Sequence, residues 1–308
     1  MATHLVKSRS DGTTSKYFST FKRWKEFITA EGGTALPAEP IHVALYITNL
    51  IDKGSTISVV QGAMYSIKWA HKLRGLKDPT NNHFVTNLVE AAKRQNVRRV
   101  VKKDILSSEQ IVSLCDKHHD SQNILVLRDL AIIVICFSGF LRFEEAISLR
   151  CMDITFHEHY MSVFLSKSKT DQYRKGNSVV INKGNTNACP MVILSRYIEC
   201  ANIDVDSVHF LFKPAYHAKG KTTLIHKNKS LSYTRTRETV VARLKEVCGD
   251  SNIGLHSLRA GGATAAARAA VNDRLWKRHG RWRSETAKDG YIEDSIEHRL
   301  RVTQALNL

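Results

Sequence analysis

The segment that most constrains the fold is the apolar run LAIIVICFSGFL at residues 130–141. It is twelve residues long, and a membrane span needs about twenty, so the run predicts a helix buried inside a globular protein. Arg142 follows directly, where this helix should end. A guanidinium is costly to bury without a partner. Either Glu145, three residues on, pairs with Arg142, or Arg142 binds an anion that a substrate brings.

Periodicity divides the chain into two predicted domains. Residues 1–98 hold four apolar segments at helical spacing, which predict a small helical bundle. A basic linker over 99–106 follows, and Ser107 with Gln110 fits a capping box that begins a helix. The second domain therefore spans 107–308.

Within the second domain, the spacing of apolar residues changes from helical to strand-like and back. Helical patterns run to about residue 150, and the stretches DITFHE, YMSVFLS and NSVVINK then alternate like strands. Helical patterns return from about 191, and a short helix is expected over 294–308. The expected fold class is thus mainly α with one small antiparallel β-sheet.

The charge is strongly basic in both predicted domains. There are 46 Lys and Arg against 29 Asp and Glu, giving a net charge of +17. The excess is shared, since residues 1–100 carry 15 basic and 7 acidic side chains. A charge of this size favours a polyanionic partner, and we expect double-stranded DNA. The alternative is a basic protein whose charge serves solubility alone.

Several functional classes are disfavoured. The six cysteines are scattered without a CxxC pair, which indicates reduced, intracellular thiols. CDKHHD and HEHY lack complementary ligands at zinc-site spacing, so no metal is expected. The first residues hold no apolar signal-peptide core, and no phosphate-binding GxxxxGK[ST] loop occurs. Obvious carboxylate pairs for a two-metal site are missing too.

Two further stretches carry basic groups that packing does not require. LSKSKTDQYRKGNSVVI predicts a hairpin with Lys167 or Lys169 at its tip. GLHSLRAGGATAAARAA places His256 and Arg259 on one helical face. The glycines after Arg259 are costly in a helix, which suggests a close backbone approach. A phosphate could bind beside the start of this helix.

The stretch GRWRSETAKDGYIEDS is charged, yet it carries Trp282 and, nine residues later, Tyr291. One reading is an aromatic pair that caps a small core. The other is that Tyr291 is a nucleophile and that Trp282 holds what it attacks.

Taken in order, these motifs resemble the tyrosine recombinase (phage integrase) family over residues 105–295. The helical first domain resembles the family's core-binding domain, and the wording GFLRFEEAISL, SKTDQYRKG and GRW…GYI is similar to recombinases of DIRS-type retrotransposons. One departure is that Arg281 separates Gly280 from the position usually held by His or Trp. We therefore align Trp282 by its distance to Tyr291 and leave His279 outside the site.

The resemblance implies a metal-independent, cofactor-free reaction through a 3′-phosphotyrosyl intermediate. Tyr291 would be the nucleophile and His256 the general base, because a phenol in water has a pKa of about 10. Lys169, or else Lys167, would protonate the leaving 5′ oxygen. The remaining implied catalytic residues bind the non-bridging phosphate oxygens, and they are Arg142, Arg259 and Trp282.

The family also implies partners and a place of action. We expect a homo-oligomer, dimeric on one DNA site and tetrameric in synapsis, acting inside the cell in the nucleus. The C-terminal helix would dock on a neighbouring protomer. Basic linker residues expected to contact DNA are Arg98, Arg99, Lys102 and Lys103. The alternatives are a type IB topoisomerase-like strand transferase, against which His256 and Trp282 count, and a domesticated DNA-binding protein without activity.

Overall fold

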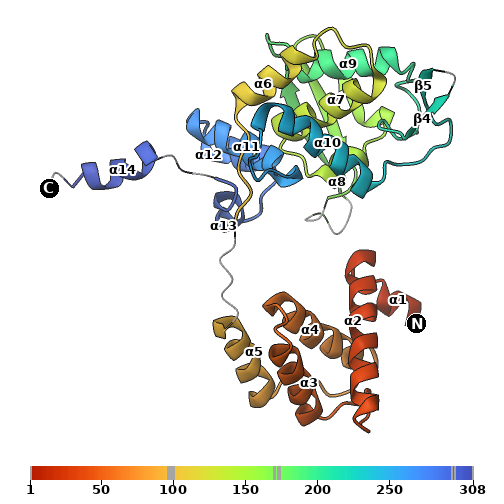
Figure 1. Cartoon of the computed structure of the whole chain (residues 1–308), viewed down its shortest axis with the longest axis vertical. Coiled ribbons are helices and arrows are strands. Elements are labelled where there is room, and N and C mark those ends of the chain that lie inside the picture. The colour runs from red at the N-terminus through yellow and green to blue at the C-terminus, as the bar shows by residue number, and fades with distance from the viewer. Residues whose placement is uncertain are drawn as a thin grey trace. The chain divides into compact units, whose positions relative to one another are not determined.

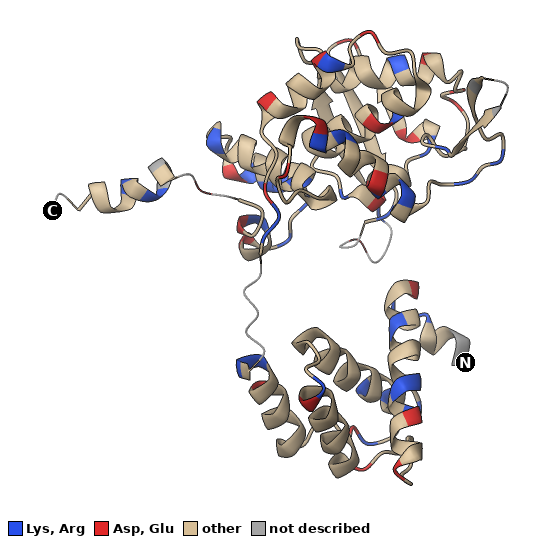
Figure 2. Cartoon of the chain, viewed as in Figure 1, with Lys and Arg blue, Asp and Glu red and all other residues tan. Residues whose placement is uncertain are grey.

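The computed structural model in Figure 1 forms two compact units, Met1–Val101 and Lys102–Leu308. The predicted linker 99–106 spans this division, and Arg98 and Arg99 lie outside the described residues. Lys and Arg residues occur on the helices of both units (Figure 2). The structure describes residues 2–95, 101–168, 171, 175–218, 220–292, 294 and 296–306.

The first unit is helical, as the apolar spacing predicts. Trp24 and Ile28, one turn apart on the second helix, are both buried in its core. Ser10 begins that helix by accepting a hydrogen bond from the Thr13 amide, and Pro40 stands at the first position of the next. The helices are α1 (Ala2–Val6), α2 (Asp11–Ala30), α3 (Pro40–Asp52), α4 (Ile57–Leu73) and α5 (His83–Gln95).

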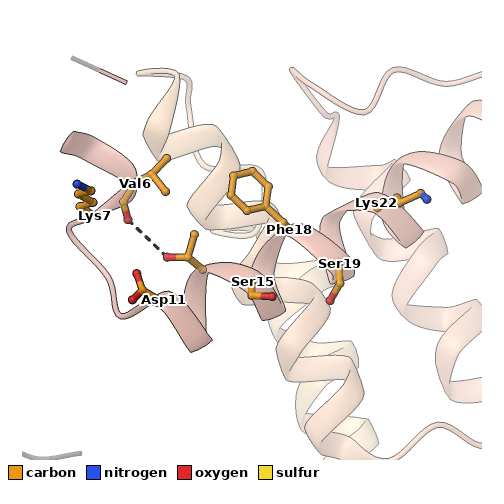
Figure 3. A pocket seen from close by; sticks show the side chains of 8 residues that line it. Val6, Lys7, Asp11, Ser15, Phe18, Ser19 and Lys22 are labelled. Atoms are coloured by element: carbon orange, nitrogen blue, oxygen red, sulfur yellow. Dashed lines mark hydrogen bonds between the residues drawn. The ribbon is translucent and has the colours of Figure 1, made fainter. Parts of the chain in front are cut away.

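A groove of about 570 Å³ lies beside α1 and α2 (Figure 3). Thr14 donates a hydrogen bond to the carbonyl oxygen of Val6 at 3.5 Å, and the exposed ring of Phe18 lines the groove. Its charged side chains are Lys7, Asp11 and Lys22. None of the predicted catalytic residues lines it.

The second unit is built around one buried helix. Residues 130–138 of the apolar run lie in α7 (Ile124–Ser138), in which the residues from Leu127 to Cys136 are all buried. The helix ends at Ser138, and Gly139 follows as its C-cap. The capping box of Ser107 and Gln110 is confirmed, with hydrogen bonds in both directions. The helices are α6 (Ser108–Lys117), α7 (Ile124–Ser138), α8 (Phe143–Ile147), the 3-10 helix η1 (Cys151–Asp153), α9 (Pro190–Cys200), α10 (Tyr233–Cys248), α11 (Leu255–Arg268), α12 (Asp273–Gly280), α13 (Glu285–Asp289) and α14 (Ile296–Gln304).

The predicted strands form an antiparallel sheet in the order β1-β2-β3. They are β1 (Ile154–Phe156), β2 (Tyr160–Leu165) and β3 (Asn177–Asn182). Alternate side chains of β2 and β3 are buried, and Met161 pairs with Ile181 across the ladder. The predicted fold class, mainly α with a small antiparallel sheet, is confirmed.

The expectation of a single sheet was wrong. A second, two-stranded sheet joins β4 (Ala215–Ala218) to β5 (Lys221–Leu224), between α9 and α10. Its strands, AYHA and KTTL, are only four residues long and do not alternate between apolar and polar residues, so periodicity gives little signal. Gly220, with φ +73°, supplies the left-handed residue at the turn.

No helix in the described part of the chain is long and apolar enough to cross a membrane.

Candidate active site

Arg142 stands just after α7, at the N-cap of α8. Its Nη1 donates to Glu145 Oε1 at 2.7 Å, and its backbone N–H donates to Glu145 Oε2 at 2.9 Å. The pairing with Glu145 is therefore formed. The Glu145 side chain is only 4% exposed, whereas that of Arg142 is 19% exposed. The guanidinium thus lies at the surface edge of a buried carboxylate, where an anion can still reach it.

Arg259 lies on α11 and is almost fully buried. Its Nη1 donates to the carbonyl oxygen of Phe140 and its Nη2 to that of Gly280, the latter at 2.6 Å. The guanidinium also lies 5.0 Å from the ring centroids of Trp282 and Tyr291. These contacts bring α11, the loop after α7 and the segment after α12 together around one positive charge.

Burial opposes the charge of Arg259. Desolvation, followed by the nearby charges of Arg142 and Arg281, lowers the pKa of Arg259 to about 10. Glu145 acts in the opposite direction but is a single carboxylate. It accepts hydrogen bonds from both Arg142 and Arg281. Arg142 and Arg281 therefore share one buried acid, which acts on Arg259 only through space, and an added anion would stabilise this arrangement.

The two glycines after Arg259 do not face a ligand. A Cβ on Gly261 would lie 2.3 Å from the carbonyl oxygen of Leu106, and one on Gly262 would lie 2.1 Å from that of Phe137. Both glycines let α11 pack closely against neighbouring backbone within the same unit. The expectation of a close approach was right, but its reason is internal packing that seats Arg259.

Tyr291 is half-buried and lies between His256 and Trp282. Its ring centroid is 5.2 Å from that of His256 and 5.5 Å from that of Trp282. Thr264 Oγ1 donates to the Tyr291 carbonyl oxygen at 3.2 Å, which holds the backbone at this point against α11. His256, in the first turn of α11, is exposed.

Trp282 belongs to a small hydrophobic cluster with Phe140, Ala263 and Trp276, against which Tyr291 packs. The reading of an aromatic pair that caps a small core is thus physically true as well. Trp282 is 7% exposed, and its indole N–H is buried without a hydrogen-bond partner among the described residues. A donor of this kind has capacity left for an acceptor.

Lys288 fixes the short helix that precedes Tyr291. Its ammonium contacts the carboxylates of Asp273, at the start of α12, and Glu285, at the start of α13. The side chain is 8% exposed and lies 5.1 Å from the ring centroid of Trp276. This ion-pair group ties α13 to α12 and so restrains the position of the nucleophile candidate.

The predicted acid for the leaving 5′ oxygen is Lys169 or Lys167. Lys169 lies outside the described residues, so its role stays a prediction. Lys167, two residues after β2, is exposed. In the linker, Lys103 Nζ donates to the Asn252 side chain, and the Lys102 carbonyl oxygen accepts from the Asn252 amide at 3.4 Å.

Sequence reasoning missed Arg281. It read this residue as a spacer, whereas the guanidinium makes four hydrogen bonds inside the site. A basic residue between Gly280 and Trp282 was the available signal, but three of its four acceptors, in Gly139, Phe140 and Glu145, are more than a hundred residues away in sequence. His279 was left outside the site, and its Nε2 lies 2.8 Å from the Ser138 carbonyl oxygen. Burial lowers the pKa of His279.

Comparison with known proteins gives a consistent result. The model of the phage integrase family matches residues 104–298. The integrase/recombinase xerD homolog of Selenomonas ruminantium is 26% identical over 292 residues, which cover 94% of this chain and 83% of that protein.

Solved structures share the fold. The site-specific recombinase XerH, in a post-cleavage complex with a palindromic difH substrate, aligns with a TM-score of 0.60 at 15% identity, covering 96% of this chain and 78% of that chain. A lambda integrase dimer bound to a COC′ core site aligns with a TM-score of 0.57 at 15% identity, covering 94% and 90% of the two chains.

Proposed function

The chain belongs to the phage integrase family, and from this premise we propose how its residues act in a site-specific tyrosine recombinase. Such an enzyme is a DNA strand transferase that works through a phosphotyrosine intermediate. The observation that carries the proposal is the cluster of Arg142, Arg259 and Arg281 around the single carboxylate of Glu145, beside the ring of Tyr291.

In the proposed reaction, the Tyr291 hydroxyl attacks the scissile phosphorus and its proton passes to His256. The bond from phosphorus to the 5′ oxygen breaks, and Lys169 protonates that oxygen. The products are a 3′-phosphotyrosyl bond and a free 5′ hydroxyl. The covalent bond keeps the phosphodiester energy for rejoining, so the chemistry needs no nucleotide or metal.

Arg142 and Arg259 would bind the non-bridging oxygens, on which negative charge grows in the transition state. Arg142 supports this role because its guanidinium makes one side-chain hydrogen bond within the described residues and stays partly exposed. Arg259 supports it through a buried charge that forms no ion pair with a carboxylate among the described residues. Trp282 would add its unpaired indole N–H.

The partner is double-stranded DNA, bound by a homo-oligomer that is dimeric on one site and tetrameric in synapsis. Related structures include a lambda integrase dimer on a core site and a lambda integrase tetramer on a Holliday junction. In support of assembly through α14, its apolar side chains Ile296, Leu300 and Val302 are exposed. We also place the protein in the DIRS-type retrotransposon branch, acting in the nucleus, on the wording of its motifs.

The decisive experiment uses a DNA duplex nicked near the crossover point, so that cleavage traps the covalent adduct. The target sequence comes from random-site selection, and the reaction runs in EDTA. A protein–DNA adduct on a denaturing gel that disappears in Tyr291→Phe is the expected result. Tight DNA binding without an adduct on any selected site would instead indicate a DNA clamp that lacks the chemistry.

A further inference from the structure

We infer that Arg281 is a positioning residue that joins the two phosphate-binding arginines, Arg142 and Arg259, into one rigid unit. This inference rests on the proposed function, because it concerns the same phosphate site. It assigns a role to a side chain that would never touch the substrate.

The terminal N–H groups of Arg281 are already in use. Its Nη1 donates to the carbonyl oxygens of Gly139 at 3.1 Å and His279 at 2.9 Å. Its Nη2 donates to the Phe140 carbonyl oxygen at 2.9 Å and to Glu145 Oε2 at 3.1 Å. A guanidinium has four terminal N–H groups, and all four have acceptors here. The fifth donor, Nε–H, is buried without a partner among the described residues. With a side chain that is 4% exposed, Arg281 therefore presents no accessible donor to a phosphate.

Two of these acceptors are shared with the arginines that would bind phosphate. The Phe140 carbonyl oxygen also accepts from Arg259, and the Glu145 carboxylate also accepts from Arg142. Arg281 therefore stands between the two, connected to each through one common acceptor. A shift of Arg281 would move both groups relative to the attacking oxygen.

The backbone supports a role for the side chain. Arg281 adopts φ +56°, in the left-handed region, where the Cβ of any residue other than glycine crowds the following carbonyl oxygen. Glycine would fit this backbone without that crowding. The arginine is thus placed where its backbone is unfavourable and its planar fork reaches four acceptors, which the single ammonium of lysine cannot match.

The charge of Arg281 also acts on its neighbours. Together with desolvation and Arg142, it lowers the pKa of Arg259, so it adds to the positive charge that awaits the phosphate. Desolvation likewise lowers the pKa of Arg281 itself, and Glu145 counteracts this. The cluster is therefore held together by hydrogen bonds against mutual repulsion, and these bonds set its geometry.

The test compares full-length wild type with Arg281→Gly and Arg281→Lys. Arg281→Gly deletes the side chain while favouring the native backbone, and Arg281→Lys keeps the charge without the fork. Arg196→Lys is the matched control, because the guanidinium of Arg196 donates to the Ser121 carbonyl oxygen outside the site. Measured are the dissociation constant for the selected duplex, the single-turnover rate of adduct formation, and the melting temperature.

We expect Arg281→Gly to form the adduct about 100-fold more slowly, as for a misplaced catalytic group, and Arg281→Lys about tenfold more slowly. DNA affinity should stay within about twofold, since phosphate contacts along the duplex dominate it. In an Arg259→Lys background, Arg281→Gly should slow the reaction by less than in the wild type, because both act through one unit.

Three outcomes would overturn the inference. They are an unchanged adduct rate in Arg281→Gly, a loss of DNA affinity or folding that accounts for the whole rate defect in both variants, and full additivity with Arg259→Lys. If the wild type itself forms no adduct, the proposed function fails and this inference fails with it. An active wild type with an equally active Arg281→Gly removes the inference alone.

Discussion

The rings of His256 and Tyr291 lie 5.2 Å apart between centroids and are tilted by 37°. This places the proposed base beside the proposed nucleophile, although the two residues stand on different elements. His256→Gln should slow adduct formation by about 10²–10⁴-fold, the usual contribution of general acid–base catalysis, with little change in DNA affinity. Single-turnover rates on the nicked duplex measure this effect. His159→Gln, an exposed histidine beside Glu158, is the control and should react like wild type; an equal defect in both variants would contradict the assignment.

Glu145 is the only carboxylate shared by two arginines among the described residues of the site. Glu145→Gln leaves buried guanidiniums without a counter-charge, so we expect a loss of about 3–5 kcal/mol in the free energy of unfolding. Sulfate should recover part of this loss by binding the folded state. Melting temperatures with and without sulfate measure both effects. Glu158→Gln, at an exposed position, is the control, and a sulfate response that is the same in all three proteins would refute the prediction.

Gly262 packs where no side chain fits, because a Cβ at this position would lie 2.1 Å from the Phe137 carbonyl oxygen. Gly262→Ala should destabilise the second unit by about 1–3 kcal/mol and slow cleavage, because α11 carries both His256 and Arg259. Gly62→Ala is the matched control, since a Cβ there meets only Lys16 Cε at 3.9 Å, and it should stabilise α4 slightly. Calorimetry of both variants measures the change in stability. An unchanged stability of Gly262→Ala would show that α11 can shift without cost.

The lowered pKa of Glu246 predicts how the free energy of unfolding changes at acidic pH. Desolvation raises its pKa, but hydrogen bonds from Lys117, His118 and Arg243 outweigh this and lower the pKa to about 2. Because the folded pKa lies below the unfolded value of about 4.5, the stabilisation is present above pH 4.5 and is lost as the pH falls toward 2. Glu246→Gln lacks this contribution. Denaturant titrations should therefore show the largest difference from wild type above pH 4.5; a difference independent of pH would contradict the sign.

Removing residues 296–308 tests assembly. In α14, Ile296 is 69% and Leu300 48% exposed, as expected of a helix that packs on another copy. Truncation should weaken assembly of two or more copies on paired sites by at least about tenfold, or about 1.4 kcal/mol. Binding to a single site should be unchanged. Gel-shift titrations on one-site and two-site duplexes separate the two effects, and an equal loss on both would refute the proposed role.

Much of the fold was predictable because its signals are local. The predominantly apolar segment 130–141 specifies a buried helix without reference to any partner, and the Ser107–Gln110 capping box needs only one turn of chain. The strands of the larger sheet are recognisable in the sequence because apolar and polar residues alternate along them. The hairpin of β4 and β5 is not recognisable in this way, since its short strands, AYHA and KTTL, lack that pattern.

For the candidate site too, local features were predictable from the sequence and long-range contacts were not. The sequence by itself determined which residue types are available, since Arg142, His256, Arg259, Trp282 and Tyr291 stand out by their type and spacing. Only the tertiary structure decided how they are connected. The role of Arg281 cannot be read from the sequence because its acceptors Gly139 and Phe140 lie 142 and 141 residues away. A hydrogen bond forms only where folding has brought donor and acceptor together.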